Sequence, residues 1–203
     1  MKIHALLFTA ALALPSIALA DSPAPTKPAP TEKSAKFSDD EVKIVAHLHH
    51  VNQMEVTMGK DAKIKGTAAV KRYGEMLIKD HSAADKELTA LAKKKGVAKI
   101  PAATPATEEE KAEMKAQHEA MMALKKLKGA DFDREYLRMM VEGHEKELAK
   151  SDVFLATAQD LDLKTALEAR KTSLQRHADA ARELQKGNAQ ASASPTPPAK
   201  TTK

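Results

Sequence analysis

Apolar residues recur at intervals of three and four along four long segments of the 203-residue chain, and this helical period constrains the fold more than any other feature. No segment alternates apolar and polar residues as a half-buried strand would. The predicted buried stripes are Leu48, Val51, Met58 and Ala62; Val70, Tyr73, Leu77, Ala84, Leu88 and Leu91; Leu137, Met140, Leu148 and Leu155; and Leu163, Leu167, Leu174, Ala181 and Leu184. The sequence therefore predicts an all-α fold in which each long helix buries one face.

Capping residues and glycines set the expected ends of the helices. Ser38 and Glu41 form a capping box, and so do Thr107 and Glu110. The expected helices run from Ser38 to about Lys65, from about Ala68 to Lys95, from Thr107 to about Lys128, from an Asp131 cap to about Gln159, and from an Asp162 cap to a point before Gly187. The third is shorter and more polar, so we predict a four-helix bundle of two long helical hairpins joined by a shorter crossover helix.

Both ends of the chain differ in composition from the helical part. Lys2, the apolar run 5–14 and Ala18-Leu19-Ala20 match a secretory signal peptide, so residues 1–20 are expected to be cleaved off after Ala20 and the protein to be periplasmic or secreted. The run is too short for a span of about 20 residues, so no transmembrane segment is predicted. Residues 21–36 and 187–203 lack periodic apolar residues, which predicts a disordered linker and tail around a domain at 37–186.

Charge and cysteine content restrict the chemistry. The net charge of +5 comes from 33 basic and 28 acidic residues with interleaved signs, so no nucleic-acid partner is expected. The chain has no cysteine, so a metal would have to be bound by histidine, methionine or carboxylate side chains. The sequence also lacks a nucleophile elbow, a phosphate loop and a dinucleotide fingerprint. A role without catalysis is favoured, and the oligomeric state is left open.

Each predicted stripe is interrupted near its middle by a polar residue that the helical period places in the core. These four residues are Glu55, His81, His144 and His177. A helix rises about 1.5 Å per residue, so the number of residues between each polar residue and the turn of its hairpin gives its depth along the bundle. On this count, the two polar residues of each hairpin lie within about one turn of each other. A buried group of this kind can be stabilised by one transition-metal ion (Zn, Fe, Mn or Cu) or by mutual hydrogen bonds that only fix the helix register. Both interpretations remain open at this point.

Other polar and sulfur-containing residues carry weaker signals. Asn52, Asp80 and Tyr136 are candidates to orient the four core residues, whereas Asp133 is expected at a helix start. The histidines at 47, 49 and 50 crowd one turn and could hold a surface ion, but a solvated helix face is the expectation. Methionine suits copper in a cysteine-free protein, yet core filling is the expected role of Met54, Met58, Met76, Met121, Met122, Met139 and Met140.

Several short motifs resemble those of one known family. They are Asn52-Gln53-Met54-Glu55-Val56, Gly59-Lys60 and Ala62; Tyr73-Gly74-Glu75-Met76 with Asp80-His81; Gly129-Ala130-Asp131-Phe132-Asp133-Arg134-Glu135-Tyr136; Met140-Val141-Glu142-Gly143-His144; and His177. Together they resemble the exported bacterial proteins of domain of unknown function 4142 (DUF4142) over about Phe37 to Leu184. The resemblance implies a ferritin-like fold and a cell-envelope component, and it implies no defined activity.

The ligand pattern differs from that of ferritin-like di-iron proteins, which carry a Glu-x-x-His on two of their helices. Ile78, Val141 and Leu174 stand three residues before the core histidines, and none of them can bridge two metals. Our first hypothesis is therefore an exported bundle that binds a single transition ion through Glu55 and the three histidines. The alternative is a non-catalytic structural or stress-related envelope module in which the polar core only fixes helix register.

Overall fold

The computed structural model describes residues 36–193, which form five helices and contain no strand. The helices are α1 (Asp39–Lys65), α2 (Ala68–Lys94), α3 (Glu108–Leu124), α4 (Gly129–Thr157) and α5 (Leu161–Ala193). None of the described helices is long and apolar enough to cross a membrane. The predicted all-α class is confirmed, whereas the predicted signal peptide, the linker up to residue 35 and the last ten residues of the predicted tail lie outside the described residues.

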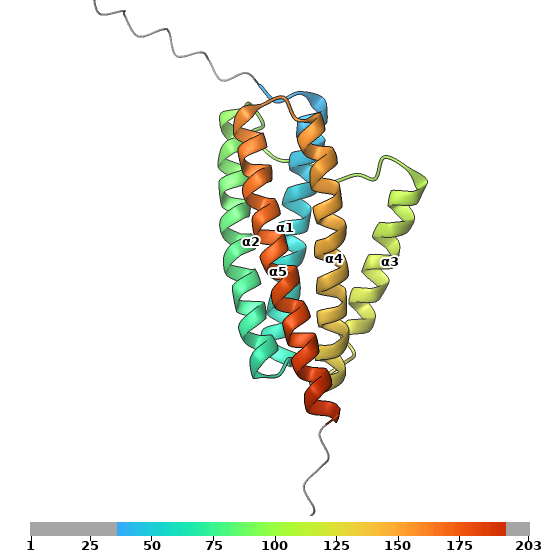
Figure 1. Ribbon diagram of the computed structural model, residues 1–203. Coiled ribbons are helices and arrows are strands. Elements are labelled where there is room, and N and C mark those ends of the chain that lie inside the picture. Colours follow the sequence, from blue (N-terminus) through green and yellow to red (C-terminus); the bar gives the residue numbers. More distant parts are fainter. Residues whose placement is uncertain (1–35, 194–203) are drawn as a thin grey trace, which may run out of the picture. The chain divides into compact units, whose positions relative to one another are not determined.

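Four of the helices form an antiparallel bundle, and the remaining helix lies outside it (Figure 1). α1 and α2 make one hairpin and α4 and α5 the other; α2 faces α5, and α1 faces α4. α3 runs alongside α4 and connects the two hairpins. This is the predicted arrangement of two long hairpins with a shorter crossover helix.

The apolar core is divided into two clusters along the bundle axis. One cluster lies toward the α1–α2 turn and includes Ala62, Leu77 and Phe132. The other lies toward the α4–α5 turn and includes Val45, Leu88 and Leu163. Along every long helix, the polar core residues fall between the segments that form these two clusters. The bundle therefore encloses a buried polar layer between two apolar ones.

Most predicted core residues are buried, and one is not. Ala84 is exposed because it lines a cleft between α2 and α5, where these two helices leave one side of the polar layer open. Four leucines at the edges of the stripes are half-buried: Leu91, Leu148, Leu155 and Leu184. The helical period thus located the core faces correctly, but it could not reveal a cleft along one of them.

The predicted helix starts on α1 and α3 are confirmed, and both predicted helix starts on the second hairpin are wrong. Ser38 and Glu41 form the expected capping box, and the Thr107 side chain accepts from the Glu110 N–H. α4 begins two residues before Asp131, and Asp160 rather than Asp162 caps α5 by accepting from the Leu163 N–H.

α5 also continues through Gly187 to Ala193 instead of ending before that glycine. Only Gly96 and Gly129 have a positive φ within the described chain, so Gly187 keeps ordinary helical geometry and does not terminate the helix.

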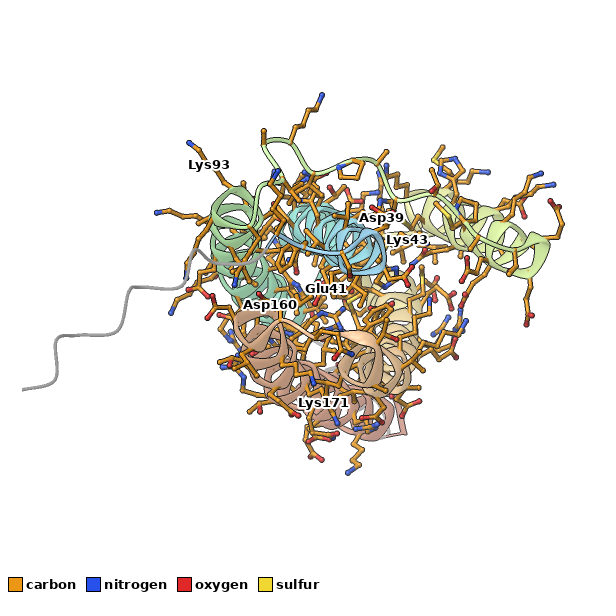
Figure 2. The ribbon with its side chains drawn as sticks, turned by 90° about the horizontal axis from the view of Figure 1, so that it is seen from above. Asp39, Glu41, Lys43, Lys93, Asp160 and Lys171 are labelled. Atoms are coloured by element: carbon orange, nitrogen blue, oxygen red, sulfur yellow. The ribbon has the colours of Figure 1, made fainter. Side chains whose placement is uncertain are left out.

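Glu41 closes one end of the bundle. Its carboxylate accepts from the Ser38 N–H at 2.9 Å, and across the bundle it accepts from the backbone N–H groups of Gln159 and Asp160 at 2.9 and 2.7 Å. Figure 2, which looks down on this end of the bundle, shows Glu41 near Asp160, whereas Lys93 points outward. Burial raises the pKa of Glu41, but these hydrogen bonds outweigh that effect and hold the pKa below its usual range.

Candidate metal centre

Three of the four predicted site residues meet in the polar layer. His81 comes from α2, His144 from α4 and His177 from α5, and each is at most 5% exposed. Their ring centroids are separated by 5.2 to 6.1 Å. One ring nitrogen of each lies within 4.8 Å of one from each of the others. The two hairpins therefore share a common level at the histidines.

One nitrogen of each ring is held by an oxygen that can only accept, so that nitrogen must carry the proton. The Nδ1 of His81 donates to Asn52 Oδ1 at 2.9 Å, and the Nδ1 of His144 to the Met140 carbonyl at 2.7 Å. The Nε2 of His177 donates to Asp80 Oδ2 at 3.0 Å. The predicted orienting roles of Asn52 and Asp80 are thus matched by direct hydrogen bonds.

The second nitrogen of each ring is buried and has no hydrogen-bond partner among the described residues. These atoms are Nε2 of His81, Nε2 of His144 and Nδ1 of His177. With the outer nitrogen protonated, each inner nitrogen of a neutral ring carries a bare lone pair. Three buried acceptors without a donor are unfavourable by themselves, since an unsatisfied buried polar group costs about 1–3 kcal/mol. A bound cation would satisfy all three at once.

The electrostatics of the centre favour the neutral form of His81 and His177. Burial, with the neighbouring His177 and His144, lowers the pKa of His81 to about 2. Burial also lowers the pKa of His177, although the hydrogen bond to Asp80 acts in the opposite direction. A neutral imidazole is the form that binds metals, so no proton has to leave the rings of His81 and His177 before an ion can bind at neutral pH.

The cluster is slightly wider than an ion requires. Zinc with Zn–N distances of about 2.0–2.1 Å holds its nitrogens about 3.3 Å apart. The upper limit of 4.8 Å between the histidine nitrogens exceeds this by about 1.5 Å. Small rotations of the three rings would close that gap, because each ring is anchored only through its outer nitrogen.

Glu55 is buried in the same layer but does not belong to the three-histidine group. Its Oε2 has no hydrogen-bond partner within the described part of the chain, and neither has the buried hydroxyl of Tyr136. Burial raises the pKa of Glu55, and the nearby His144 counteracts part of that rise. Glu55 therefore stands beside the centre, close enough to interact electrostatically with one of its rings.

A cleft of about 510 Å³ between α2 and α5 connects the centre to the surface. His81 and His177 line it together with Asn52, Asp80 and Arg176. Two of the three imidazoles therefore border this cleft, and so does the carboxylate of Asp80.

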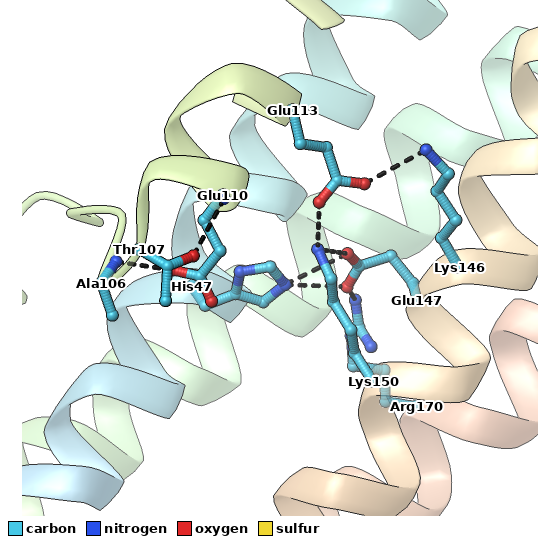
Figure 3. A network of polar contacts seen from close by, with 9 residues as sticks. All are labelled: His47, Ala106, Thr107, Glu110, Glu113, Lys146, Glu147, Lys150 and Arg170. Atoms are coloured by element: carbon cyan, nitrogen blue, oxygen red, sulfur yellow. Dashed lines mark hydrogen bonds and ion pairs between the residues drawn. The ribbon is translucent and has the colours of Figure 1, made fainter. Parts of the chain in front are cut away.

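A buried charge network lies one turn from the centre and was not predicted. Glu147 on α4 accepts from His47 Nε2 at 3.0 Å and from Arg170 Nη2 at 2.6 Å (Figure 3). Arg170 stands three residues after Leu167 and four before Leu174, so it interrupts a predicted stripe in the same way as His177. The rule that identified the histidines would have found this arginine as well.

The remaining polar predictions have mixed outcomes. His47 and His49 each contact a carboxylate: His47 contacts Glu147, and His49 contacts Asp85 at 2.6 Å, whereas His50 is exposed. Asp133 lies inside the first turns of α4, but its carboxylate holds the start of α2 by accepting from Thr67 N at 3.1 Å. Met58 and Met140 are buried in the apolar core, as expected.

The fold and the histidine layer define the chain as a helical-bundle protein with a buried polar centre. The chain belongs to the family described as domain of unknown function DUF4142, whose model matches residues 26–184. The family resemblance is thereby confirmed. No curated protein matches the sequence. A solved structure of CopM in the silver-bound form, obtained by co-crystallization, has a similar fold. It is 15% identical with a TM-score of 0.54, and the match covers 73% of this chain and 94% of that one.

Proposed function

We propose that this protein is an exported, non-enzymatic helical bundle that binds one transition-metal ion through His81, His144 and His177, with Glu55 as the acidic group that offsets the charge of the ion. The observation that carries the proposal is the set of three buried inner nitrogens without a hydrogen-bond partner among the described residues. Each outer nitrogen is fixed by a carbonyl or carboxylate oxygen, which is the arrangement of metal-binding histidines in proteins.

The donor set favours some ions over others. Imidazole nitrogens suit zinc, copper and iron, whereas manganese prefers oxygen ligands. Affinity for such sites rises from manganese through iron to copper and falls again at zinc. Copper and zinc are therefore the preferred candidates of the four. The silver carried by the structurally similar CopM supports a bundle of this shape as a host for thiophilic metal ions.

The absence of bridging carboxylates favours binding over oxygen chemistry. Ferritin-like di-iron centres need glutamates on several helices to hold two ions. Among the described residues, the three histidines are the only group of three or more histidine or carboxylate side chains whose ligand atoms come within 4.8 Å of one another. A single ion held by neutral rings fits this arrangement, and a pair of bridged irons does not.

Zinc titration with a thermal melt tests the proposal. At a free zinc concentration 100 times the dissociation constant, binding stabilises the protein by about 2.7 kcal/mol, so the melting temperature should rise by about 5–10 °C. His144→Gln should remove the rise, while His49→Gln, whose ring is bound to Asp85 outside the centre, should keep it. Mass spectrometry of the intact chain should count one zinc ion. A melting temperature of the unmodified protein that rises with neither zinc nor copper would refute metal binding at this centre.

The alternative is a structural envelope module in which the polar layer fixes helix register. Its supporting observation is that two hydrogen bonds of the layer join different helices: Asn52 to His81 and Asp80 to His177. Under this alternative, His144→Gln lowers the melting temperature equally with and without added metal. Under the metal hypothesis, the loss is larger in the presence of the ion.

Export by the signal peptide is part of the same proposal. Its support is the match of residues 1–20 to a secretory signal and the membership in a family of exported proteins. N-terminal sequencing of the chain recovered from the periplasm or medium should begin at Asp21. Recovery only from the cytoplasm, with Met1 or Lys2 at the N-terminus, would exclude export.

A further inference from the structure

A second cleft, of about 360 Å³, lies between α1 and the outer helix α3, and it does not include the three-histidine centre. α1 contributes His50 and Met54 to its lining, and α3 contributes Met114, His118 and Met121. Two imidazoles and three thioethers therefore border one space. No carboxylate of the described residues is among its lining side chains.

The spacing of these residues places them on facing sides of the two helices. His50 and Met54 are four residues apart, as are Met114 and His118, and Met121 follows three residues later. Residues three and four apart lie on the same face of a helix, one turn from each other. Each helix thus presents an imidazole and at least one thioether to the cleft.

Packing accounts for only part of this arrangement. Met54 and Met121 rest against the apolar cluster near the α1–α2 turn, but Met114 belongs to neither of the two clusters found in the described chain. His118 is exposed, and neither it nor His50 forms a hydrogen bond within residues 36–193. The nitrogens of both rings and the sulfur of Met114 are therefore available as ligands.

α3 is attached to the bundle in a way that leaves room for adjustment. Its buried Leu124 anchors one end in the core. Further along, Glu113 contacts Lys146 and Lys150 of α4 at 3.1 and 3.5 Å, through one exposed and one half-buried ion pair (Figure 3). Exposed ion pairs of this kind contribute little, about 0–1 kcal/mol. A small movement of the Glu113 end of α3 toward α1 would bring Met114 and His118 closer to α1, while Leu124 stays in the core.

Thioether sulfur is a soft, neutral ligand that selects Cu(I) and does not suit zinc or magnesium. A cleft lined by imidazoles and thioethers offers no carboxylate to a divalent ion, but it fits a soft monovalent one. We propose that the α1–α3 cleft is a second metal site, which binds one Cu(I) ion, or its redox-inert analogue Ag⁺, through Met114, Met121 and Met54 with His50 and His118. This site is independent of whether the three-histidine centre binds an ion.

The test is Ag⁺ titration of the full chain in chloride-free buffer, followed by calorimetry and by NMR of the methionine methyl groups. The Met114→Leu/Met121→Leu variant keeps the volume of both side chains and should bind one Ag⁺ fewer than the unmodified protein. Met122→Leu, at an exposed neighbouring position outside the cleft, should bind as much as the unmodified protein. The methyl signals of Met114 and Met121 should shift at one equivalent of Ag⁺.

His118→Gln provides a second variant that cannot disturb the core, since the ring is exposed, and it should weaken Ag⁺ binding at least tenfold. If the three-histidine centre binds nothing, the unmodified protein still binds one Ag⁺ and the double methionine variant binds none. Zinc-induced stabilisation through the centre should be unchanged in both variants. Equal Ag⁺ binding by the double variant and the unmodified protein, or methyl signals that do not move, would overturn the proposal.

Discussion

The orientation of the three core histidines depends on which nitrogen of each ring is bonded outward. Asp80 illustrates this best, because one carboxylate oxygen accepts from His177 Nε2 and also from Arg176 Nη2 at 2.8 Å. A carboxylate behind a metal-binding imidazole fixes its tautomer and increases the basicity of the opposite nitrogen. The properties of the centre are therefore set partly by residues that do not touch the ion.

Replacing Asp80 should weaken the centre without removing a ligand. In Asp80→Asn the acceptor loses its charge, and we expect the zinc affinity to fall about 10- to 100-fold, the usual effect of losing such a partner. Asp85→Asn is the matched control. Like Asp80, Asp85 bonds a histidine, but its partner is His49 on α1, which lies outside the centre. Competition with a chromophoric chelator measures both affinities. An equal affinity in the two variants would show that Asp80 does not support the ion.

At the scale of the helices, α1 and α2 approach each other closely at two glycines. A Cβ atom on Gly74 would lie 2.7 Å from the Gly59 carbonyl oxygen and 2.7 Å from the Ala62 Cβ. Since real Cβ atoms essentially never approach backbone so closely, the helix axes can come together only where both residues lack a side chain. This contact sets the spacing of the first hairpin, which carries Asn52, Glu55 and His81.

Gly74→Ala should therefore separate α1 from α2. We expect it to lower the free energy of unfolding by about 2–3 kcal/mol, as overpacking commonly does, and to lower the melting temperature. Gly143→Ala is the matched control: it lies in the middle of α4, and apart from its chain neighbours and the nearby backbone of its own helix, no described atom lies within 4 Å of an added Cβ. That variant should gain about 0.5–1 kcal/mol, because alanine favours the helix over glycine. Urea denaturation followed by circular dichroism measures both, and two changes of the same sign would contradict the close contact.

The sequence predicts a feature of a helix when residues close in sequence determine that feature unambiguously. The Ser38–Glu41 capping box and the inward positions of His81, His144 and His177 follow from residues close in sequence, and the structure contains both features. The α5 cap and the path through Gly187 were missed, because several nearby residues offer equivalent local signals. The convergence of Met54 with Met114 also escaped prediction, since it depends on where α3 lies against α1.

At the scale of the whole molecule, one buried carboxylate links three helices of the bundle. Glu147 on α4 contacts His47 of α1 and Arg170 of α5, and Arg170 Nη1 also donates to Ser151 Oγ at 3.1 Å. Lys150 extends the network to Glu113 of α3. Burial raises the pKa of Glu147, but the hydrogen bond and charge of His47 and those of Arg170 prevail and lower it to about 2. The folded state therefore strongly favours the ionised form of the Glu147 carboxylate.

This carboxylate should make the bundle sensitive to acid. Because the pKa of Glu147 falls from 4.5 in the unfolded chain to about 2 in the folded protein, its contribution is complete above about pH 4.5 and is lost as the pH falls toward about 2. The shift corresponds to a stabilisation on the order of 3 kcal/mol. Glu147→Gln should therefore be less stable than the unmodified protein at pH 7, with a difference that shrinks below pH 4.5.

Comparing the two proteins isolates Glu147, since every other carboxylate titrates in both. Glu145→Gln serves as the control, because Glu145 lies on the same helix in an exposed ion pair with Arg182. Its difference from the unmodified protein should stay below about 1 kcal/mol at every pH. The measurement is urea unfolding at intervals from pH 7 to pH 3. A Glu147→Gln difference that stays constant over this range would mean that the ionised carboxylate does not hold α1, α4 and α5 together.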